Sequence, residues 1–193
     1  MDLIDAQERA STCSLCTISN NRKSSVFAKG NPDADIMLCG MCPGPEENSV
    51  FNRVGHPFVG KSGKFLDNVL MKSKLTLKNV YITNVVKCYV GSSGIKLTNE
   101  WIDKCFPYLI EQIGVIEPKV ILTLGTDASR ALLNLSKNIS LESIRGKRYK
   151  FTDKISVIAT YHPSYILRFG GKNNANYNNF LDDLSWAKEI ISR

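Results

Sequence analysis

The 193-residue chain lacks several features that would place it in a specialised class of protein. It has no apolar run close to the about 20 residues that a membrane-spanning helix needs. Residues 1–9 contain acidic side chains and no apolar stretch, so we expect no secretory signal there. No internal repeat is present, which argues against a solenoid or a propeller. We therefore expect one intracellular domain over residues 1–193 that has no membrane segment.

The composition is that of an ordinary globular protein with a basic surplus. Hydrophobic residues make up 43% of the chain and charged residues 22%, and the length suits one sizeable core. The 25 Lys and Arg exceed the 18 Asp and Glu, which gives a net charge of +7. Basic proteins often bind polyanions, because Lys and Arg displace counterions from phosphate backbones. A charged, well-solvated surface explains the same surplus, so charge alone favours nucleic acid only weakly.

Short apolar runs alternate with longer amphipathic segments along the chain. Strands are predicted at 34–40, 80–87, 119–124 and 155–161. Helices are predicted at 63–72, 99–116, 126–135 and 178–192, and the Asn- and Gly-rich segment 170–179 is predicted to be a loop. The alternation predicts an α/β fold, a three-layer sandwich with a mainly parallel four-stranded central sheet. In such sheets the functional site lies at the carboxyl ends of the strands.

The sequence contains six cysteines: Cys13, Cys16, Cys39, Cys42, Cys88 and Cys105. In a reducing compartment they are not expected to form disulfides, so metal binding or burial must explain them. Cys13 and Cys16 form a C-x-x-C pair, Cys88 follows the second predicted strand, and Cys105 lies in the long predicted helix. Four thiolates suit zinc or an iron–sulfur cluster equally well, and spacing alone favours zinc as the commoner structural metal. The second C-x-x-C pair, which begins at Cys39, is better explained by burial in the core.

Small and polar residues follow the first two predicted strands. The turn from Gly40 to Gly44 allows backbone amides to approach a planar ligand closely, because its glycines carry no side chain. Asn84 interrupts an apolar strand, and its amide offers a donor and an acceptor that match the edge of a base. A hydrogen bond to the backbone at the strand end is the simpler alternative for Asn84. Phe58 suits stacking on a base, and a place in the core explains it equally well.

The segment after the last predicted strand begins with His162. A histidine followed by Ile166, Leu167 and Arg168 suits an apolar wedge that enters a duplex while the histidine faces an extruded base. A helix N-terminus capped by Ser164 is the alternative for this segment. Each feature has a structural explanation of its own, but four of them at four successive strand ends favour a binding site.

Together these segments resemble the uracil-DNA glycosylase superfamily, and most closely its family 4, the iron–sulfur type. The resemblance runs from about Cys13 to the C-terminal helix, which is nearly the whole chain. It rests on these segments: Cys13-x-x-Cys16, GMCPGPEEN at 40–48, GHPFVGKSGKFLD at 55–67, VYITNVVKC at 80–88, CFPYL at 105–109, VILTLG at 120–125, Arg145-Gly146 and TYHPSYILR at 160–168.

The resemblance implies the following site residues. A structural [4Fe–4S] cluster would be held by Cys13, Cys16, Cys88 and Cys105, with an N-terminal cluster-binding loop at about residues 10–30. Uracil and the attacking water would lie against Gly40, Met41 and Cys42, with Phe58 stacking on uracil, Asn84 reading its edge and His162 stabilising negative charge on it. The implied DNA-binding residues are Lys61, Ser62, Ser164, Ile166, Leu167 and Arg168.

The function implied by the resemblance is hydrolysis of the N-glycosidic bond of deoxyuridine in DNA, which leaves an abasic site for base excision repair. The expected partner is uracil-containing DNA, single- or double-stranded, and the expected state is a monomer. One residue departs from the family pattern, because Met41 stands where the family usually has a Glu that helps to activate water. The alternative is therefore a uracil- or DNA-binding protein of the same fold with weak or no catalysis. A structural accessory domain of a replication complex is a remoter alternative.

Overall fold

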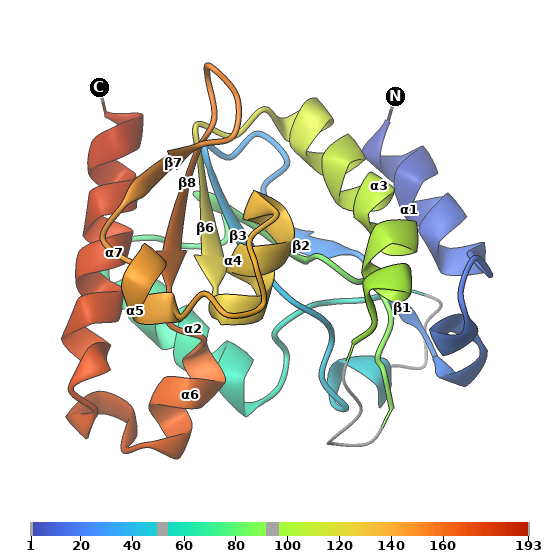
Figure 1. Cartoon of the computed structure of the whole chain (residues 1–193), viewed down its shortest axis with the longest axis horizontal. Coiled ribbons are helices and arrows are strands. Elements are labelled where there is room, and N and C mark those ends of the chain that lie inside the picture. Colours follow the sequence, from blue (N-terminus) through green and yellow to red (C-terminus); the bar gives the residue numbers. More distant parts are fainter. Residues whose placement is uncertain (1, 50–53, 92–96, 193) are drawn as a thin grey trace.

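The computed structural model describes residues 2–49, 54–91 and 97–192, and a β-sheet lies between layers of helices (Figure 1). In spatial order, the strands of this sheet are β2 (Ala28–Gly30), β5 (Val80–Asn84), β3 (Ile36–Gly40), β6 (Val120–Leu124), β8 (Ser156–Thr160) and β7 (Arg148–Lys150). A separate small sheet pairs β1 (Ser25–Val26) in parallel with β4 (Val54–Gly55).

The four predicted strands are confirmed as the parallel centre of the sheet, but the prediction of a four-stranded sheet was wrong. Two further strands, β2 and β7, extend it to six by antiparallel pairing with β5 and β8. Each of these edge strands has only three residues, all of them at least partly exposed. They therefore lack the continuous apolar run from which the central strands were predicted.

The central strands separate two hydrophobic cores. In β3 the side chains of Ile36 and Leu38 enter one core, and those of Met37 and Cys39 enter the other. This follows from the two-residue period of a strand, whose successive side chains point to opposite faces. All four side chains are fully buried, which confirms the prediction that Cys39 belongs to the core.

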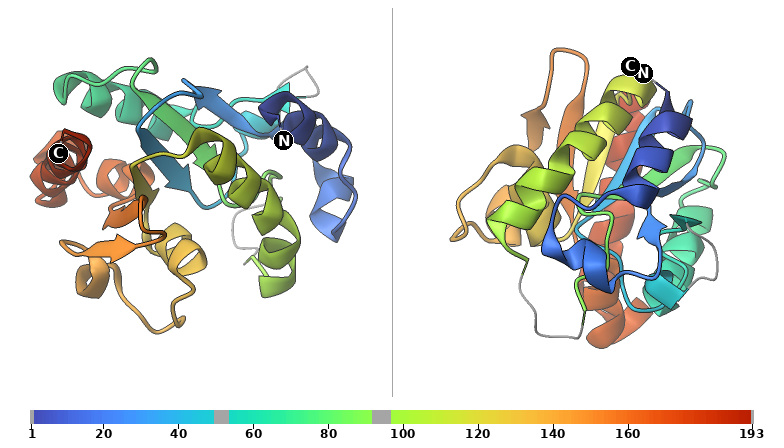
Figure 2. Two further views of the ribbon diagram at one scale, coloured as in Figure 1. Left: turned by 90° about the horizontal axis from the view of Figure 1, so that it is seen from above. Right: turned by 90° about the vertical axis from the view of Figure 1, so that its right-hand side faces the viewer.

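Two sets of helices cover the two cores, as the view from above shows (Figure 2). The first core is completed by α2 (Lys61–Lys72), α5 (Leu141–Ile144), α6 (Pro163–Arg168) and α7 (Asn176–Ile191), and the second by α1 (Leu3–Thr12), α3 (Asn99–Ile116) and α4 (Thr126–Leu133). Three short 3-10 helices lie between these elements: η1 (Thr17–Asn21), η2 (Glu47–Ser49) and η3 (Gly171–Asn173). The observed layers are those of the predicted three-layer sandwich.

Local signals in the sequence located some helix ends correctly. Thr98 caps α3 as predicted, since its hydroxyl accepts a hydrogen bond from the N–H of Trp101 at 3.2 Å. The loop predicted at 170–179 was wrong in part, because η3 and the first turn of α7 lie within it. There the side chain of Asn174 accepts a hydrogen bond from the N–H of Asn176 at 2.7 Å. An asparagine that suggests a loop therefore supports the start of a helix.

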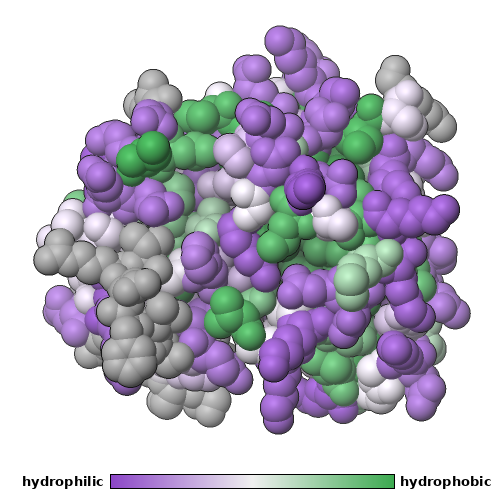
Figure 3. Space-filling model, turned by 180° about the vertical axis from the view of Figure 1, so that it is seen from behind, coloured by the Kyte–Doolittle hydropathy of each residue, from purple (hydrophilic) through white to green (hydrophobic). Residues whose placement is uncertain are grey.

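The four parallel strands bring their carboxyl ends to one edge of the sheet. In Figure 1 this is the lower edge, where α6 lies, and both chain termini lie at the upper edge. The back of the molecule is mostly hydrophilic, with hydrophobic side chains in separate patches (Figure 3). Within the described residues, no helix is both long and apolar enough to cross a membrane.

Candidate active site

Gly40 and Asn84 end neighbouring parallel strands and lie directly opposite each other. A Cβ atom on Gly40 would lie 2.3 Å from Oδ1 of Asn84 and 2.9 Å from Cζ of Phe58. Only glycine therefore allows the amide and the aromatic ring to approach the same point. Asn84 is 2% exposed, and its backbone carbonyl accepts a hydrogen bond from Lys87. This bond uses the backbone of Asn84 and leaves its amide facing Gly40.

Phe58 belongs both to the first core and to the site. Its φ angle is 56°, a left-handed conformation that is uncommon for an aromatic residue. Lys29 Nζ donates to its carbonyl at 3.0 Å, its N–H donates to Glu47 Oε1 at 2.7 Å, and the absence of a side chain at Gly63 leaves room for its carbonyl. These neighbours hold a conformation that the residue would not otherwise keep. Its ring lies 5.9 Å from that of His162, measured between centroids.

His162 is itself the N-cap of α6, a role that the sequence alternative had given to Ser164. Its Nδ1 accepts a hydrogen bond from the N–H of Ser164 at 3.1 Å and lies 2.7 Å from the Ser164 hydroxyl. With Nδ1 as acceptor, the proton of the neutral ring belongs on Nε2. Removal of the ring from solvent lowers the pKa of His162 to about 4. At neutral pH the site therefore contains an uncharged N–H donor.

Glu47 is a site residue to which the sequence had assigned no role. Its side chain is buried, and its two carboxylate oxygens accept hydrogen bonds from the backbone N–H groups of Phe58 and Gly44. Burial raises the pKa of Glu47, and these N–H donors act in the opposite direction. Both oxygens accept hydrogen bonds from the backbone, so Glu47 is a positioning residue. It joins the turn after β3 to the segment that contains Phe58. In the sequence, the only indication of this role was the pair of glutamates after the Pro-Gly-Pro turn. The pair did not show which way either side chain points.

Met41 and Cys42 follow Gly40, and both side chains pack against the second core. The carbonyls of Gly40 and Met41 each accept a hydrogen bond at 2.9 Å, from the N–H groups of Val85 and Val86. The turn is thus attached to the backbone that follows Asn84. Burial raises the pKa of the Cys42 thiol to about 11. Neither side chain brings a charge to the turn.

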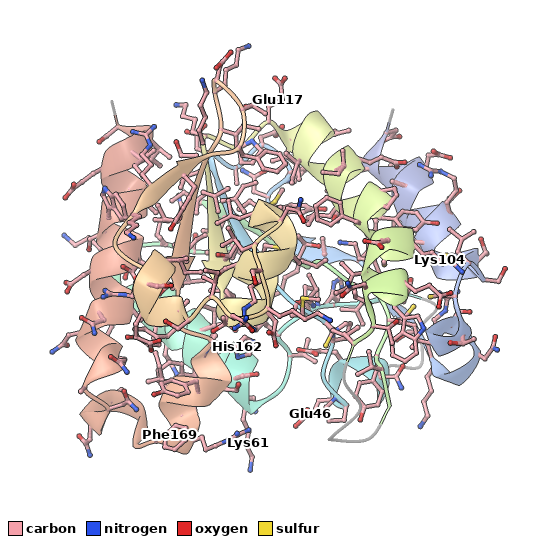
Figure 4. All side chains as sticks on the ribbon, viewed as in Figure 1. Glu46, Lys61, Lys104, Glu117, His162 and Phe169 are labelled. Carbon is pink, nitrogen blue, oxygen red and sulfur yellow. The ribbon has the colours of Figure 1, made fainter. Side chains whose placement is uncertain are left out.

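The residues predicted to contact DNA do not all reach the surface. Lys61, Leu167 and Arg168 are exposed, and Ser62 and Ser164 are partly buried. Ile166 is completely buried in the first core, so its prediction as a wedge residue was wrong. The segment is helical, and residue 166 occupies the inner face of α6 while residues 165 and 167 face outward. Figure 4 shows Lys61 and Phe169 at the lower edge of the molecule, below His162.

The four cysteines predicted to bind a metal centre line one common cavity. Cys13 is the C-cap of α1 and Cys16 the N-cap of η1, while Cys88 and Cys105 are buried in the body of the fold. Arg22 Nη1 donates to Cys88 Sγ at 3.3 Å. Burial raises the pKa of Cys88, and that of Cys105 to about 11. In the part of the chain that the structure describes, no three His, Cys, Asp or Glu side chains form a group that could hold a single metal ion.

Lys87 connects this cavity with Asn84. The backbone N–H of Lys87 donates a hydrogen bond to Cys105 Sγ at 3.2 Å, and the side chain of Lys87 is buried. The ammonium donates to the carbonyl of Asn84 at 2.5 Å, to Gln112 Oε1 at 2.6 Å and to Thr83 Oγ1 at 2.9 Å. Burial lowers the pKa of Lys87 to about 8. The three hydrogen bonds use all three donors of the ammonium.

Comparison with known proteins shows the family to which the chain belongs. The chain belongs to the Uracil DNA glycosylase superfamily, whose family model matches residues 27–185. It is similar to the type-4 uracil-DNA glycosylase of Thermotoga maritima, with 34% identity over 96% of this chain and 93% of that protein. The type-4 uracil-DNA glycosylase of Pyrobaculum aerophilum is 33% identical over 87% of this chain and 86% of its own length. That of Sulfurisphaera tokodaii is 38% identical over 83% and 74%. The resemblance predicted from the sequence is confirmed.

We predict that Lys87→Met destabilises the protein strongly, because it removes the three hydrogen bonds that the buried ammonium donates. A hydrogen bond from a charged group contributes about 1.5–3 kcal/mol, so the free energy of unfolding should fall by about 3 kcal/mol or more. Chemical denaturation measures this change. The control is Lys150→Met, which removes an exposed ion pair with Asp153 and should cost less than about 1 kcal/mol. Equal losses in the two variants would contradict the role given to Lys87.

Proposed function

We propose that the protein is a type-4 uracil-DNA glycosylase that hydrolyses the N-glycosidic bond of deoxyuridine in DNA and leaves an abasic site. The observation that carries the proposal is the convergence of Asn84, Phe58 and His162 around Gly40 at the carboxyl edge of the sheet. The similarity to type-4 glycosylases over most of both chains favours an enzyme over a binding protein or an accessory domain. We further propose that it acts as an intracellular monomer on single- or double-stranded DNA.

Recognition of uracil is assigned to Asn84 and Phe58. An amide presents a donor and an acceptor side by side, and the uracil edge presents the complementary acceptor and donor. Cytosine has the opposite pattern on this edge, so an Asn84 amide held in the orientation that matches uracil would reject it. The ring of Phe58 supplies a fixed surface beside the base. Preorganisation of both groups by the sheet and by Glu47 keeps the cost of ordering them low.

Bond cleavage depends on stabilising the departing base. When the bond between C1′ and N1 breaks, its electrons pass to uracil, and negative charge develops on the uracil oxygens. The Nε2–H of neutral His162 is a donor that strengthens as this charge develops, so it stabilises the transition state more than the ground state. A water molecule then bonds to C1′ of the deoxyribose and loses a proton to the solvent, and the uracil anion takes up a proton from the solvent. With Met41 at the turn, leaving-group stabilisation carries more of the rate than in relatives with Glu at this position.

DNA binding is assigned to the exposed residues around α6 and the start of α2. Lys61 and Arg168 supply positive charge for the phosphate backbone, and Ser62 and Ser164 supply hydroxyl groups. Leu167 is the apolar side chain that fills the stack when a base leaves a duplex. Ile166 supports this surface from the core and does not enter the DNA.

We propose that Cys13, Cys16, Cys88 and Cys105 hold a [4Fe–4S] cluster. Their common cavity supports the assignment, as do the N–H groups of Arg22 and Lys87 that donate to two of the sulfurs. Donors of this kind favour the thiolate form that binds metal. The cluster would be structural, because it would join the N-terminal segment to α3 and to the residues after β5. Zinc on the same cysteines is the alternative that metal analysis tests.

We predict that uracil excision is most sensitive to His162 and Asn84. Loss of one donor to a developing anion costs on the order of 100-fold in rate, so His162→Ala should lower the rate of abasic-site formation by this factor. Asn84→Ala should lower both the rate and the preference for uracil over cytosine. The measurement is single-turnover cleavage of a labelled uracil oligonucleotide, and His56→Ala, which alters the exposed histidine, is the matched control. An active wild type whose rate both site variants leave unchanged would refute the assignment.

We predict that Met41→Glu raises the excision rate. A carboxylate at this turn can orient the attacking water and stabilise positive charge on the deoxyribose, which Met cannot do. Met41→Gln is the control, since it has a similar size and no charge. The same oligonucleotide assay measures both variants. An inactive wild type that becomes active as Met41→Glu would favour the binding-protein alternative for the natural chain.

We predict that the purified protein is brown and contains about four irons per chain, the stoichiometry of a four-cysteine cluster. Cys88→Ser should lose iron and lower the melting temperature, whereas Cys42→Ser should keep its iron, because Cys42 does not line the cavity. Iron analysis and visible absorption give the result. A colourless protein with one bound zinc would exclude the cluster.

A further inference from the structure

Three aromatic side chains run from the interior to the surface along one side of α6. They are Tyr161, Tyr165 and Phe169, and we call them the aromatic ladder. The centroids of the first two rings are 5.8 Å apart with nearly parallel planes, and those of the last two are 4.9 Å apart. The exposed fraction rises outward, from 6% at Tyr161 to 42% at Tyr165 and 58% at Phe169. Their four-residue spacing places the rings on one side of the helix.

The inner end of the ladder is anchored. The guanidinium of Arg145 lies over the ring of Tyr161, with Cζ 5.5 Å from the centroid. Arg145 Nε in turn donates to the buried carboxylate of Asp183 at 2.8 Å, and its Nη2 donates to the carbonyl of Asn179 at 2.8 Å. This arrangement fixes the first ring and limits the motion of the two that pack outward from it. The outer rings are therefore a preorganised surface, which lowers the entropy cost of binding.

The ladder begins beside the site. Tyr161 directly precedes His162, and the chain from there leads through Tyr165 to Phe169, which Figure 4 shows at the lower edge of the molecule near Lys61. Helices α2 and α6, which carry these residues, pack against each other. Exposed cations lie on the neighbouring segments: Arg168 directly precedes Phe169, Lys172 lies in η3, and Lys61 begins α2, and both η3 and α2 pack against α6. Aromatic faces bordered by cations form the kind of surface on which proteins bind single-stranded nucleic acid.

We propose that Tyr165 and Phe169 stack on an unpaired base of the uracil-containing strand and thereby favour uracil in single-stranded DNA. The proposal rests on the proposed function, since it concerns the strand whose uracil enters the site. A base in a duplex already stacks on its neighbours, so only an unpaired base offers a free face to these rings. Stacking on an aromatic ring tolerates any base, so the effect is independent of the sequence beside uracil.

The test compares Phe169→Leu with the wild type. Leucine keeps an apolar side chain but removes the aromatic face. We expect the dissociation constant for a single-stranded oligonucleotide to rise about tenfold, a typical effect of losing one stacked base, and that for the matching duplex to stay within about twofold. Both oligonucleotides contain 2′-fluorinated deoxyuridine, which resists cleavage, so binding is measured apart from catalysis. Phe169→Trp should restore tight single-strand binding, and Met71→Ala, at an exposed apolar position in α2, should leave both constants unchanged.

A second readout reports the stacking itself. The fluorescent base 2-aminopurine, placed beside uracil in the single strand, should be quenched by the wild type and bright with Phe169→Leu. Wild-type protein that binds these oligonucleotides but releases no uracil from a cleavable substrate would count against the proposed function alone. Active wild type would leave that function intact, and the ladder proposal would fail if Phe169→Leu then bound single strands as tightly, with the same quenching. Equal weakening for single strands and duplexes would also overturn it.

Discussion

The hydrogen bonds of the buried Lys87 connect Asn84, at the end of β5, with the cavity that the four cysteines line. The ammonium donates a hydrogen bond to the backbone carbonyl of Asn84, and the backbone N–H of Lys87 donates one to Cys105 Sγ. A buried charge is tolerated only when its donors are all used, and here Gln112 and Thr83 complete the set. The position of Asn84 therefore depends on α3 and on the cysteine cavity as well as on its own strand.

A second set of contacts fixes the opposite side of the site. Phe58 has a strained backbone that three neighbours hold, and one of these neighbours is the carboxylate of Glu47. Since Glu47 also accepts a hydrogen bond from the N–H of Gly44, it links the turn after β3 to the backbone of Phe58. Met41 brings no carboxylate to this turn, and the oxygens of Glu47 accept hydrogen bonds from its backbone. In the proposed mechanism, His162 therefore stabilises charge while Glu47 fixes the backbone around the site.

The central strands could be predicted from the sequence because both of their faces are buried, which produces continuous apolar runs. The edge strands β2 and β7 could not, since half-exposed segments of three residues carry no such pattern. Asn84 was singled out because it interrupts an apolar strand and His162 because it follows one, and the structure places both at the carboxyl edge of the sheet. The error at Ile166 arose because a six-residue helix is too short for its periodicity to show which side faces the core. The orientation of the Glu47 side chain could not be predicted either. It depends on a hydrogen bond from the backbone N–H of Phe58, which only the fold brings close to Glu47.

In the proposed mechanism, the neutral state of His162 affects the step that follows cleavage of the N-glycosidic bond. A charged imidazolium would form an ion pair with the uracil anion and would hold the product in the site. A neutral ring whose pKa is about 4 donates a hydrogen bond without that attraction. Once water protonates the free base, a single neutral hydrogen bond and ring contact with Phe58 remain on this side of the site. In that mechanism, the burial that keeps the ring uncharged removes an attraction that would slow product release.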